Sequence, residues 1–319
     1  MNRFLELFEI PQPLIEPALQ ACRLFNTSLD SMFYDVPALV RGLAERGLTV
    51  GTGDGAESPG RLNLSALKDP EGSLLVVDPA KPPYIRAFHD VELFLRCDEP
   101  DIRTVATATI TGVGSSALGS AALAWNVAEA SGAPVLAIVP GYGVADVVTQ
   151  ALGGWFGFGL FDYLHVKSQV QSTLGAVAPK TARIGRTLST SVPGSRHLSN
   201  GAPIFRTGSG SSDVLHALMQ ERNLECVVGH SKGALAIHNA LGSLERSRTK
   251  GLKIVTLGCP IAEDVGNASY HQYLGLFDAL GQLNAWGNRP DSWVPTDHST
   301  NTALPFSMPV EMLVDRADA

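Results

Sequence analysis

The sequence has few of the residues that mark several large classes of protein. Charged side chains make up 17% of its 319 residues, and the formal net charge is −7. No cluster of Lys and Arg offsets this negative charge locally, although DNA and RNA binding depend on a positive surface. We therefore expect no nucleic-acid partner.

Cysteine is also scarce. The chain has four cysteines, and no two of them form a C-x-x-C pair. That spacing is typical of zinc sites and redox motifs, so we expect no metal site and no cofactor. Cys226 and Cys259 fall within apolar runs, where a free thiol behaves as a small hydrophobic side chain. Buried free thiols favour a cytoplasmic location.

Long hydrophobic runs are missing as well. A membrane-spanning helix needs about 18 or more consecutive apolar residues. The nearest approach, residues 117–127, contains Gly, Ser, Trp and Asn and suits a packed helix better. Residues 1–9 carry acidic side chains and lack the basic start of a signal peptide. We expect no integral membrane segment, and nothing in the sequence predicts an oligomeric state.

What the sequence does contain, from about residue 102 onward, is a regular alternation of apolar strand-like and helix-like runs. Such alternation is typical of a parallel sheet covered by helices on both faces. We therefore predict an α/β fold with a mostly parallel central sheet. Strands are expected at 73–77, 91–95, 104–110, 133–139, 224–228, 252–257 and 292–294.

The same patterns predict how the chain is divided. The expected parts are a helical N-terminal extension with the first strands (1–90), an α/β core (91–146 and 208–319), and a lid or cap insertion (147–207). The insertion carries the aromatic side chains Trp155, Phe156 and Phe158. These residues either form the small core of a helical subdomain or line an apolar substrate pocket, and both interpretations can hold together.

Residues 229–233 read Gly-His-Ser-Lys-Gly, which matches the pattern G-x-S-x-G. An apolar run precedes them, and a helix-like run, 234–241, follows. In this context a serine sits on a sharp turn and is exposed as a nucleophile. Glycine on either side tolerates the close approach of the backbone. We interpret Ser231 as a nucleophile, in preference to an ordinary strand-to-helix turn.

A serine hydroxyl needs a base to take its proton, and the base needs an acid to orient it. Two histidines, His271 and His298, follow the helix after Ser231. His298 comes just after the strand-like residues 292–294, whereas His271 precedes a strand. We predict that His298 is the base.

Two aspartates compete for the role of the orienting acid. Asp278 ends the apolar run 272–277 and lies 20 residues before His298, which leaves room for a helix and a strand. Asp291 lies seven residues before His298, too few for a crossover between parallel strands. We favour Asp278. Asp291 stays the alternative, because a continuous helix over 273–283 would make Asp278 an ordinary helix residue.

Attack on a carbonyl also creates an oxyanion, which needs backbone donors aimed at it. One donor is expected to be the N–H of the residue after the nucleophile, Lys232. The second is expected from the loop 111–115, which ends a strand and opens a helix. Within that loop we favour Val113, with Gly114 as the alternative.

In this order the motifs resemble those of the α/β-hydrolase superfamily, most closely its serine esterases and lipases. The resemblance spans roughly residues 90–310, although the loop before the oxyanion helix has no His-Gly pair. It implies a Ser231–Asp278–His298 triad that cleaves a small-molecule or lipid ester through an acyl-serine, without a cofactor. The matching parts are 111–114, 140–143, Ser231, 275–278 and His298.

Other interpretations compete with ester hydrolysis. Acyl transfer and thioester cleavage use the same triad, and a hydrolase-like fold can serve for binding alone. Tyr163 and Lys167 have the Tyr-x-x-x-Lys spacing of short-chain dehydrogenases, and residues 111–119 are glycine-rich. The glycines miss the G-x-G-x-x-G spacing of a dinucleotide-binding turn, so we do not favour an NAD(P)-dependent reductase.

Overall fold

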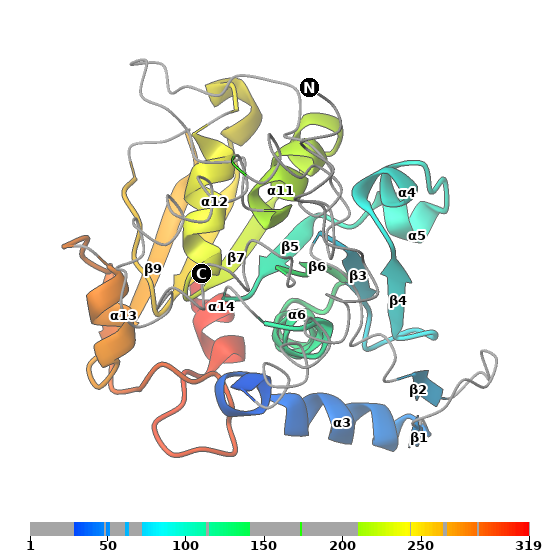
Figure 1. Ribbon diagram of the computed structural model, residues 1–319, viewed down its shortest axis with the longest axis horizontal. Coiled ribbons are helices and arrows are strands. Elements are labelled where there is room, and N and C mark those ends of the chain that lie inside the picture. Colours follow the sequence, from blue (N-terminus) through cyan, green and yellow to red (C-terminus); the bar gives the residue numbers. More distant parts are fainter. Residues whose placement is uncertain are drawn as a thin grey trace, which may run out of the picture.

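The computed structural model describes residues 29–47, 49–51, 61–63, 72–112, 115–140, 173, 210–242, 244–263, 267–285 and 287–318. This part of the chain forms an eight-stranded, mostly parallel sheet (Figure 1). Within it, β3 runs antiparallel to both of its neighbours. The strands lie in the order β10 (Ser292–Val294), β9 (Ser269–Gly275), β8 (Lys253–Leu257), β7 (Cys226–His230), β5 (Thr107–Ile110), β6 (Val135–Ile138), β3 (Leu74–Val77) and β4 (Ile85–Phe88).

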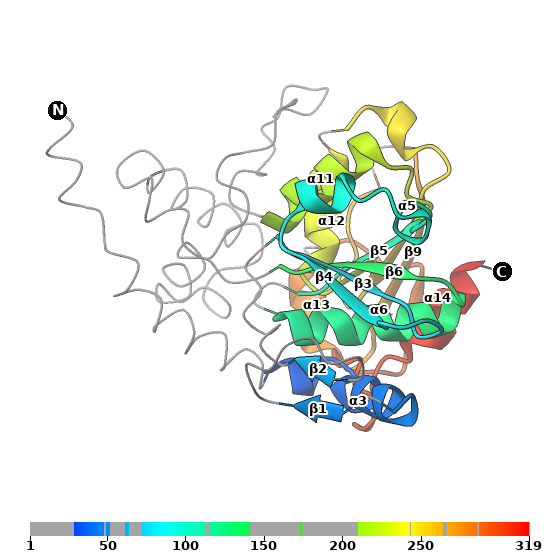
Figure 2. The ribbon, with the colours of Figure 1, turned by 90° about the vertical axis from the view of Figure 1, so that its right-hand side faces the viewer.

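Helices cover both faces of the sheet, and Figure 2 shows the layers edge-on. On one face lie α4 (Val91–Leu95), α5 (Pro100–Arg103), α11 (Gly210–Glu221) and α12 (Gly233–Leu241). On the other lie α6 (Ala117–Ser131) and α14 (Val310–Asp318), with α3 (Val36–Glu45) packed outside α6. The prediction of an α/β fold with a mostly parallel sheet is confirmed.

Alternate residues of the central strands point to opposite faces, as the two-residue period of a strand requires. Val227 and Ile254 contribute to the core under α11 and α12. Val228 and Val255 contribute to the core under α6. Because both faces are buried, these strands read as continuous apolar runs. That is why their positions could be predicted from the sequence.

One predicted strand is wrong. Residues 91–95 form the helix α4, not a strand. The Asp90 side chain accepts a hydrogen bond from the Leu93 N–H at 2.8 Å and so caps the helix. Val91 and Phe94, three residues apart, both face the core. The cap and this helical spacing outweigh the apolar character that suggested a strand.

Several parts of the predicted division can be placed. β3 and β4 belong to the same sheet as the strands that follow residue 91. β1 (Thr49–Gly51) and β2 (Arg61–Asn63) pair in a separate two-stranded parallel sheet. The predicted lid, 147–207, lies outside the described residues apart from residue 173. Among the helices that the structure describes, none is long and apolar enough to cross a bilayer.

The remaining described elements lie beyond β7. A short 3₁₀ helix, η3 (Arg246–Thr249), precedes β8, and α13 (Ala279–Asn284) follows β9. β7, β8, β9 and β10 are parallel neighbours, so their carboxyl ends meet at one edge of the sheet. In open α/β sheets, ligands bind at this edge. Ser231, Asp278 and His298 all follow strands that end there.

Candidate active site

Ser231 sits on a sharp turn between β7 and α12. Its φ is 52°, in the left-handed region that a non-glycine residue seldom adopts. A Cβ at Gly233 would fall within 3.0 Å of the carbonyl oxygens of Ile110, the last residue of β5, and of Thr111 after it. A Cβ at Gly229 would meet the backbone of the following helix at 2.8 Å. Neither glycine of G-x-S-x-G therefore has room for a side chain. The close packing of the backbone at these two positions holds Ser231 in its strained conformation.

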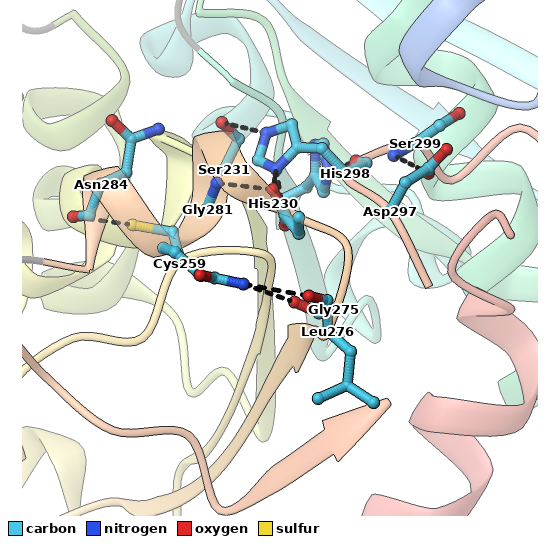
Figure 3. A network of polar contacts seen from close by, with 12 residues as sticks. His230, Ser231, Cys259, Gly275, Leu276, Gly281, Asn284, Asp297, His298 and Ser299 are labelled. Carbon is cyan, nitrogen blue, oxygen red and sulfur yellow. Dashed lines mark hydrogen bonds and ion pairs between the residues drawn. The ribbon is translucent and has the colours of Figure 1, made fainter. Parts of the chain in front are cut away.

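The structure brings Ser231, His298 and Asp278 together in one hydrogen-bonded chain. His298 Nε2 lies 2.8 Å from Ser231 Oγ (Figure 3). His298 Nδ1 lies 2.8 Å from each carboxylate oxygen of Asp278. A carboxylate only accepts hydrogen bonds, so Nδ1 carries the proton and Nε2 accepts from the serine hydroxyl. A serine nucleophile requires this polarity of its base.

Asp278 is held in place from several sides. It lies three residues beyond the end of β9 and caps α13, accepting a hydrogen bond from the Gly281 N–H at 2.5 Å. A Cβ at Gly258, whose φ is +70°, would come within 3.0 Å of both the Asp278 carboxylate and the His298 ring. The continuous helix over 273–283 that would have excluded Asp278 does not form, because β9 occupies its first part.

The other residues considered for the triad lie elsewhere. Asp291 accepts a hydrogen bond from the backbone N–H of Gln272 at 2.7 Å, near the start of the pairing between β9 and β10. His271 lies within β9, so it neither precedes nor ends that strand. A further acidic residue, Asp297, directly precedes His298 in the chain and accepts a hydrogen bond from the Ser299 N–H at 2.8 Å (Figure 3).

The predicted oxyanion donors are only partly within the described residues. Lys232 follows Ser231 at the N-terminus of α12, where backbone N–H groups point away from the helix. Its side chain is buried, and burial lowers the pKa of the ammonium to about 8. A Cβ at Gly112 would come 3.3 Å from Ser231 Cβ, so the loop after β5 reaches the nucleophile. Val113 and Gly114 lie outside the described residues.

Three buried groups around the triad were not anticipated from the sequence. His230, the last residue of β7, places its ring 4.9 Å from the ring of His298. The Tyr34 hydroxyl accepts a hydrogen bond from the Gly112 N–H at 2.7 Å. The Asp30 carboxylate accepts hydrogen bonds from the start of the helix that follows this loop. A histidine in an apolar strand beside the nucleophile was a visible signal, whereas Tyr34 and Asp30 had none in the local sequence.

The Asp30 carboxylate is buried against the N-terminus of α6. It accepts hydrogen bonds from the Ser115 hydroxyl and from the Ser116 N–H, each at 2.8 Å. Burial raises the pKa of Asp30 to about 6, although these hydrogen bonds act in the opposite direction. Asp30 therefore anchors the loop that follows β5 to the segment around residues 30–35.

The same segment holds the loop that carries His298. The Thr300 N–H and hydroxyl both donate to the Phe33 carbonyl, each at 2.8 Å. The Ser299 hydroxyl donates to the Met32 carbonyl, and the Asn301 side chain donates to the Ser31 carbonyl, both at 2.7 Å. The position of His298 thus depends on contacts between parts of the chain more than 260 residues apart.

Other predicted site residues cannot be placed. Trp155, Phe156 and Phe158, suggested for a substrate pocket, lie outside the described residues, as do Tyr163 and Lys167. Within the described ranges, no group of three or more His, Cys, Asp or Glu side chains is arranged to hold a metal ion. Gly112, in the glycine-rich stretch of the reductase interpretation, lies beside Ser231.

The sequence was compared with protein-family models and with curated proteins, and neither comparison found a match. Any functional conclusion therefore depends on the site itself. Its central feature is a serine on a strained turn, hydrogen-bonded to a histidine that a buried carboxylate orients.

Proposed function

We propose that the protein is a serine hydrolase of the α/β-hydrolase type that cleaves carboxylic esters. The observation that carries the proposal is the chain of contacts from Ser231 Oγ through His298 to Asp278, each 2.8 Å long. Nucleophile, base and orienting acid in this geometry define acyl transfer to serine on several unrelated folds.

In the proposed first half-reaction, Ser231 Oγ attacks the ester carbonyl carbon and its proton passes to His298 Nε2. The carbonyl oxygen becomes an oxyanion, for which the Lys232 N–H is the first proposed donor and Val113 or Gly114 the second. Collapse of this intermediate breaks the bond to the alcohol, which leaves with the proton from His298. Asp278 stabilises the imidazolium throughout.

In the second half-reaction, water replaces the alcohol. His298 takes a proton from the water, the resulting hydroxide attacks the acyl-serine, and the carboxylic acid is released as Ser231 regains its proton. An acceptor alcohol or amine in place of water would give acyl transfer, and a thioester would enter by the same steps. The apolar residues proposed for the pocket, Trp155, Phe156 and Phe158, favour an acyl ester as the substrate.

The proposal is tested by replacing the nucleophile. Ser231→Ala is expected to lower turnover of a p-nitrophenyl ester by about 10⁴-fold or more while the protein remains folded. A fluorophosphonate probe should label the wild type once per chain and leave the variant unlabelled, as measured by intact mass.

Ser292→Ala is the matched control, because Ser292 is an exposed serine at the start of β10. It should be labelled and should turn over ester as the wild type does. A folded wild-type protein that reacts with neither probe nor ester would overturn the proposal in favour of a binding protein.

A further inference from the structure

The ring of His230 lies against the ring of His298, which Phe33 also meets edge-on at 5.9 Å between ring centroids. His230 is 1% exposed, and the proposed reaction does not use it. Its ring centroid lies 4.9 Å from that of His298 and 5.2 Å from that of Tyr34, which it meets edge-on. A buried imidazole costs free energy unless its nitrogen atoms are hydrogen-bonded, so its partners indicate its role.

Both nitrogen atoms of His230 have partners, and these partners determine where the proton lies. Nε2 is 2.9 Å from the backbone carbonyl oxygen of His298, which only accepts, so Nε2 carries the proton and donates. Nδ1 is 3.1 Å from the Tyr34 hydroxyl. A neutral imidazole has a single N–H, so Nδ1 accepts from Tyr34, whose oxygen in turn accepts from the Gly112 N–H at 2.7 Å.

The neutral state of His230 agrees with its surroundings. Burial, together with the nearby His298 ring, lowers the pKa of His230 to about 3. The hydroxyl of Tyr34 is likewise kept protonated, because burial raises its pKa. The four groups therefore form one directed chain: Gly112 N–H to Tyr34, Tyr34 O–H to His230, and His230 N–H to the His298 carbonyl.

We propose that His230 is a positioning residue that, together with Tyr34, sets the distance between the loop after β5 and the backbone of the base. This inference rests on the proposed function. Asp278 orients the imidazole of His298, but it contacts only the side chain. The backbone of His298 lies in a segment without regular secondary structure, and His230, the last residue of β7, holds its carbonyl.

This chain of hydrogen bonds joins the turn of Ser231, the backbone of His298 and the loop after β5, which must act together in the proposed reaction. Ser231 is the next residue after His230, so any shift of the His298 backbone relative to β7 changes the distance from Ser231 Oγ to His298 Nε2. A displacement of about 1 Å in such a site can lower turnover by about 10²-fold. At the other end of this chain of hydrogen bonds, Gly112 adjoins the proposed oxyanion donors Val113 and Gly114.

Two substitutions of His230 distinguish a positioning role from a role in packing alone. His230→Gln places an amide N–H near the position of Nε2, so it can still donate to the His298 carbonyl. His230→Asn places its amide near the position of Nδ1, so it can accept from Tyr34 but does not reach that carbonyl. We expect kcat to stay within about threefold in His230→Gln and to fall about 30-fold in His230→Asn, with KM changed less than twofold in both.

Tyr34→Phe removes the hydroxyl in the middle of this chain of hydrogen bonds and leaves the aromatic ring unchanged. It removes the donor to His230 and the acceptor of the Gly112 N–H, and we expect kcat to fall about tenfold. It also provides a result if His230→Asn does not fold. Equal kcat values in His230→Gln and His230→Asn, or an unchanged kcat in Tyr34→Phe, would overturn the proposal.

A spectroscopic readout keeps this test separate from that of the proposed function. In ¹⁵N-histidine-labelled wild-type protein, His230 should show a protonated Nε2 and an unprotonated Nδ1 at neutral pH. The nitrogen shifts of His298 should move in His230→Asn and stay near their wild-type values in His230→Gln. These measurements need no substrate. An inactive wild type with these shifts would overturn ester hydrolysis alone, and a protonated Nδ1 on His230 would overturn the positioning role alone.

Discussion

Ser231 and His298, the proposed nucleophile and base, are held in place by different means. The turn at Ser231 is shaped by its own strand and helix and by the neighbouring strand β5, against which Gly233 packs directly. The loop at His298 has no regular secondary structure, and hydrogen bonds from residues 299–301 tie it to residues 31–33. One support is the packing of strands and a helix within the sheet, and the other is a set of hydrogen bonds between segments more than 260 residues apart.

This difference indicates how each region should respond to substitution. A change in the nucleophile turn meets rigid backbone on neighbouring elements and should mainly reduce stability. A change near the base can alter hydrogen bonds while the sheet remains intact, and should mainly reduce turnover. Three predictions follow the comparison, from the largest expected effect to the smallest.

The largest effect is expected at the acid that orients the base. Asp278→Asn should lower kcat by about 10⁴-fold, because an amide favours the wrong tautomer of His298. The protein should remain folded, since an Asn oxygen can still accept from the Gly281 N–H. Ester turnover and a thermal melt measure the two effects.

Asp291→Asn is the matched control for this substitution. Its amide oxygen can still accept from the Gln272 N–H, which is the hydrogen bond that the Asp291 carboxylate makes. We expect wild-type turnover. A greater loss of turnover in Asp291→Asn than in Asp278→Asn would contradict the geometry of the triad.

The next effect is expected in the nucleophile turn. Gly233→Ala would place a methyl group against the carbonyl oxygens of Ile110 and Thr111. We expect the free energy of unfolding to fall by about 3 kcal/mol, at the upper end of the range for overpacking, as measured by urea denaturation. Gly132→Ala is the comparison, because a Cβ there meets nothing within 4 Å and only the φ of +62° is strained. Its cost should be about 1 kcal/mol, and equal costs would argue against the packing explanation.

The smallest effect is expected at Asp30, in the segment around residues 30–35 that contacts both the loop after β5 and the loop that carries His298. Burial raises the pKa of Asp30 to about 6 in the folded protein, above its ordinary value of 3.8. Between these values the folded state binds more protons than the unfolded state, so its stability should fall as pH rises. Relative to Asp30→Asn, wild-type protein should lose about 2 kcal/mol of unfolding free energy between pH 4 and pH 7.

Subtraction of the Asp30→Asn curve removes the contribution of other titrating groups, provided that the substitution leaves them unchanged. Urea denaturation at several pH values gives both curves. A difference that stays constant, or that changes in favour of wild type as pH rises, would show that Asp30 is not a buried carboxyl of this kind.

The comparison also explains what could be predicted from the sequence. Ser231 was identifiable because the constraints on its turn are local: two glycines, a buried strand before it and a helix after it. Asp278 and His298 could be chosen because parallel strands bring their carboxyl ends to one edge. Hydrophobic periodicity was sufficient for most strands, and it failed at 91–95, where the cap of Asp90 decides the conformation.

The supports of the site could not be predicted in the same way. Tyr34 lies 196 residues from His230 in the chain, and no pattern around it indicates that its hydroxyl meets a histidine. Asp30 lies 85 residues from Ser115. Such pairs are set by how elements pack in three dimensions, and a sequence without aligned relatives carries no direct record of that packing.

The hydrogen bonds between residues 31–33 and 299–301 have a consequence for the order of steps in folding. Contacts of such long sequence separation require the closure of a large loop, and proteins dominated by them fold slowly. The turn at Ser231 can form with its sheet, whereas the base can reach its final position only after the two distant segments have met. During refolding, recovery of the proposed ester turnover should therefore lag behind recovery of helical circular dichroism, and the lag would time the last assembly step.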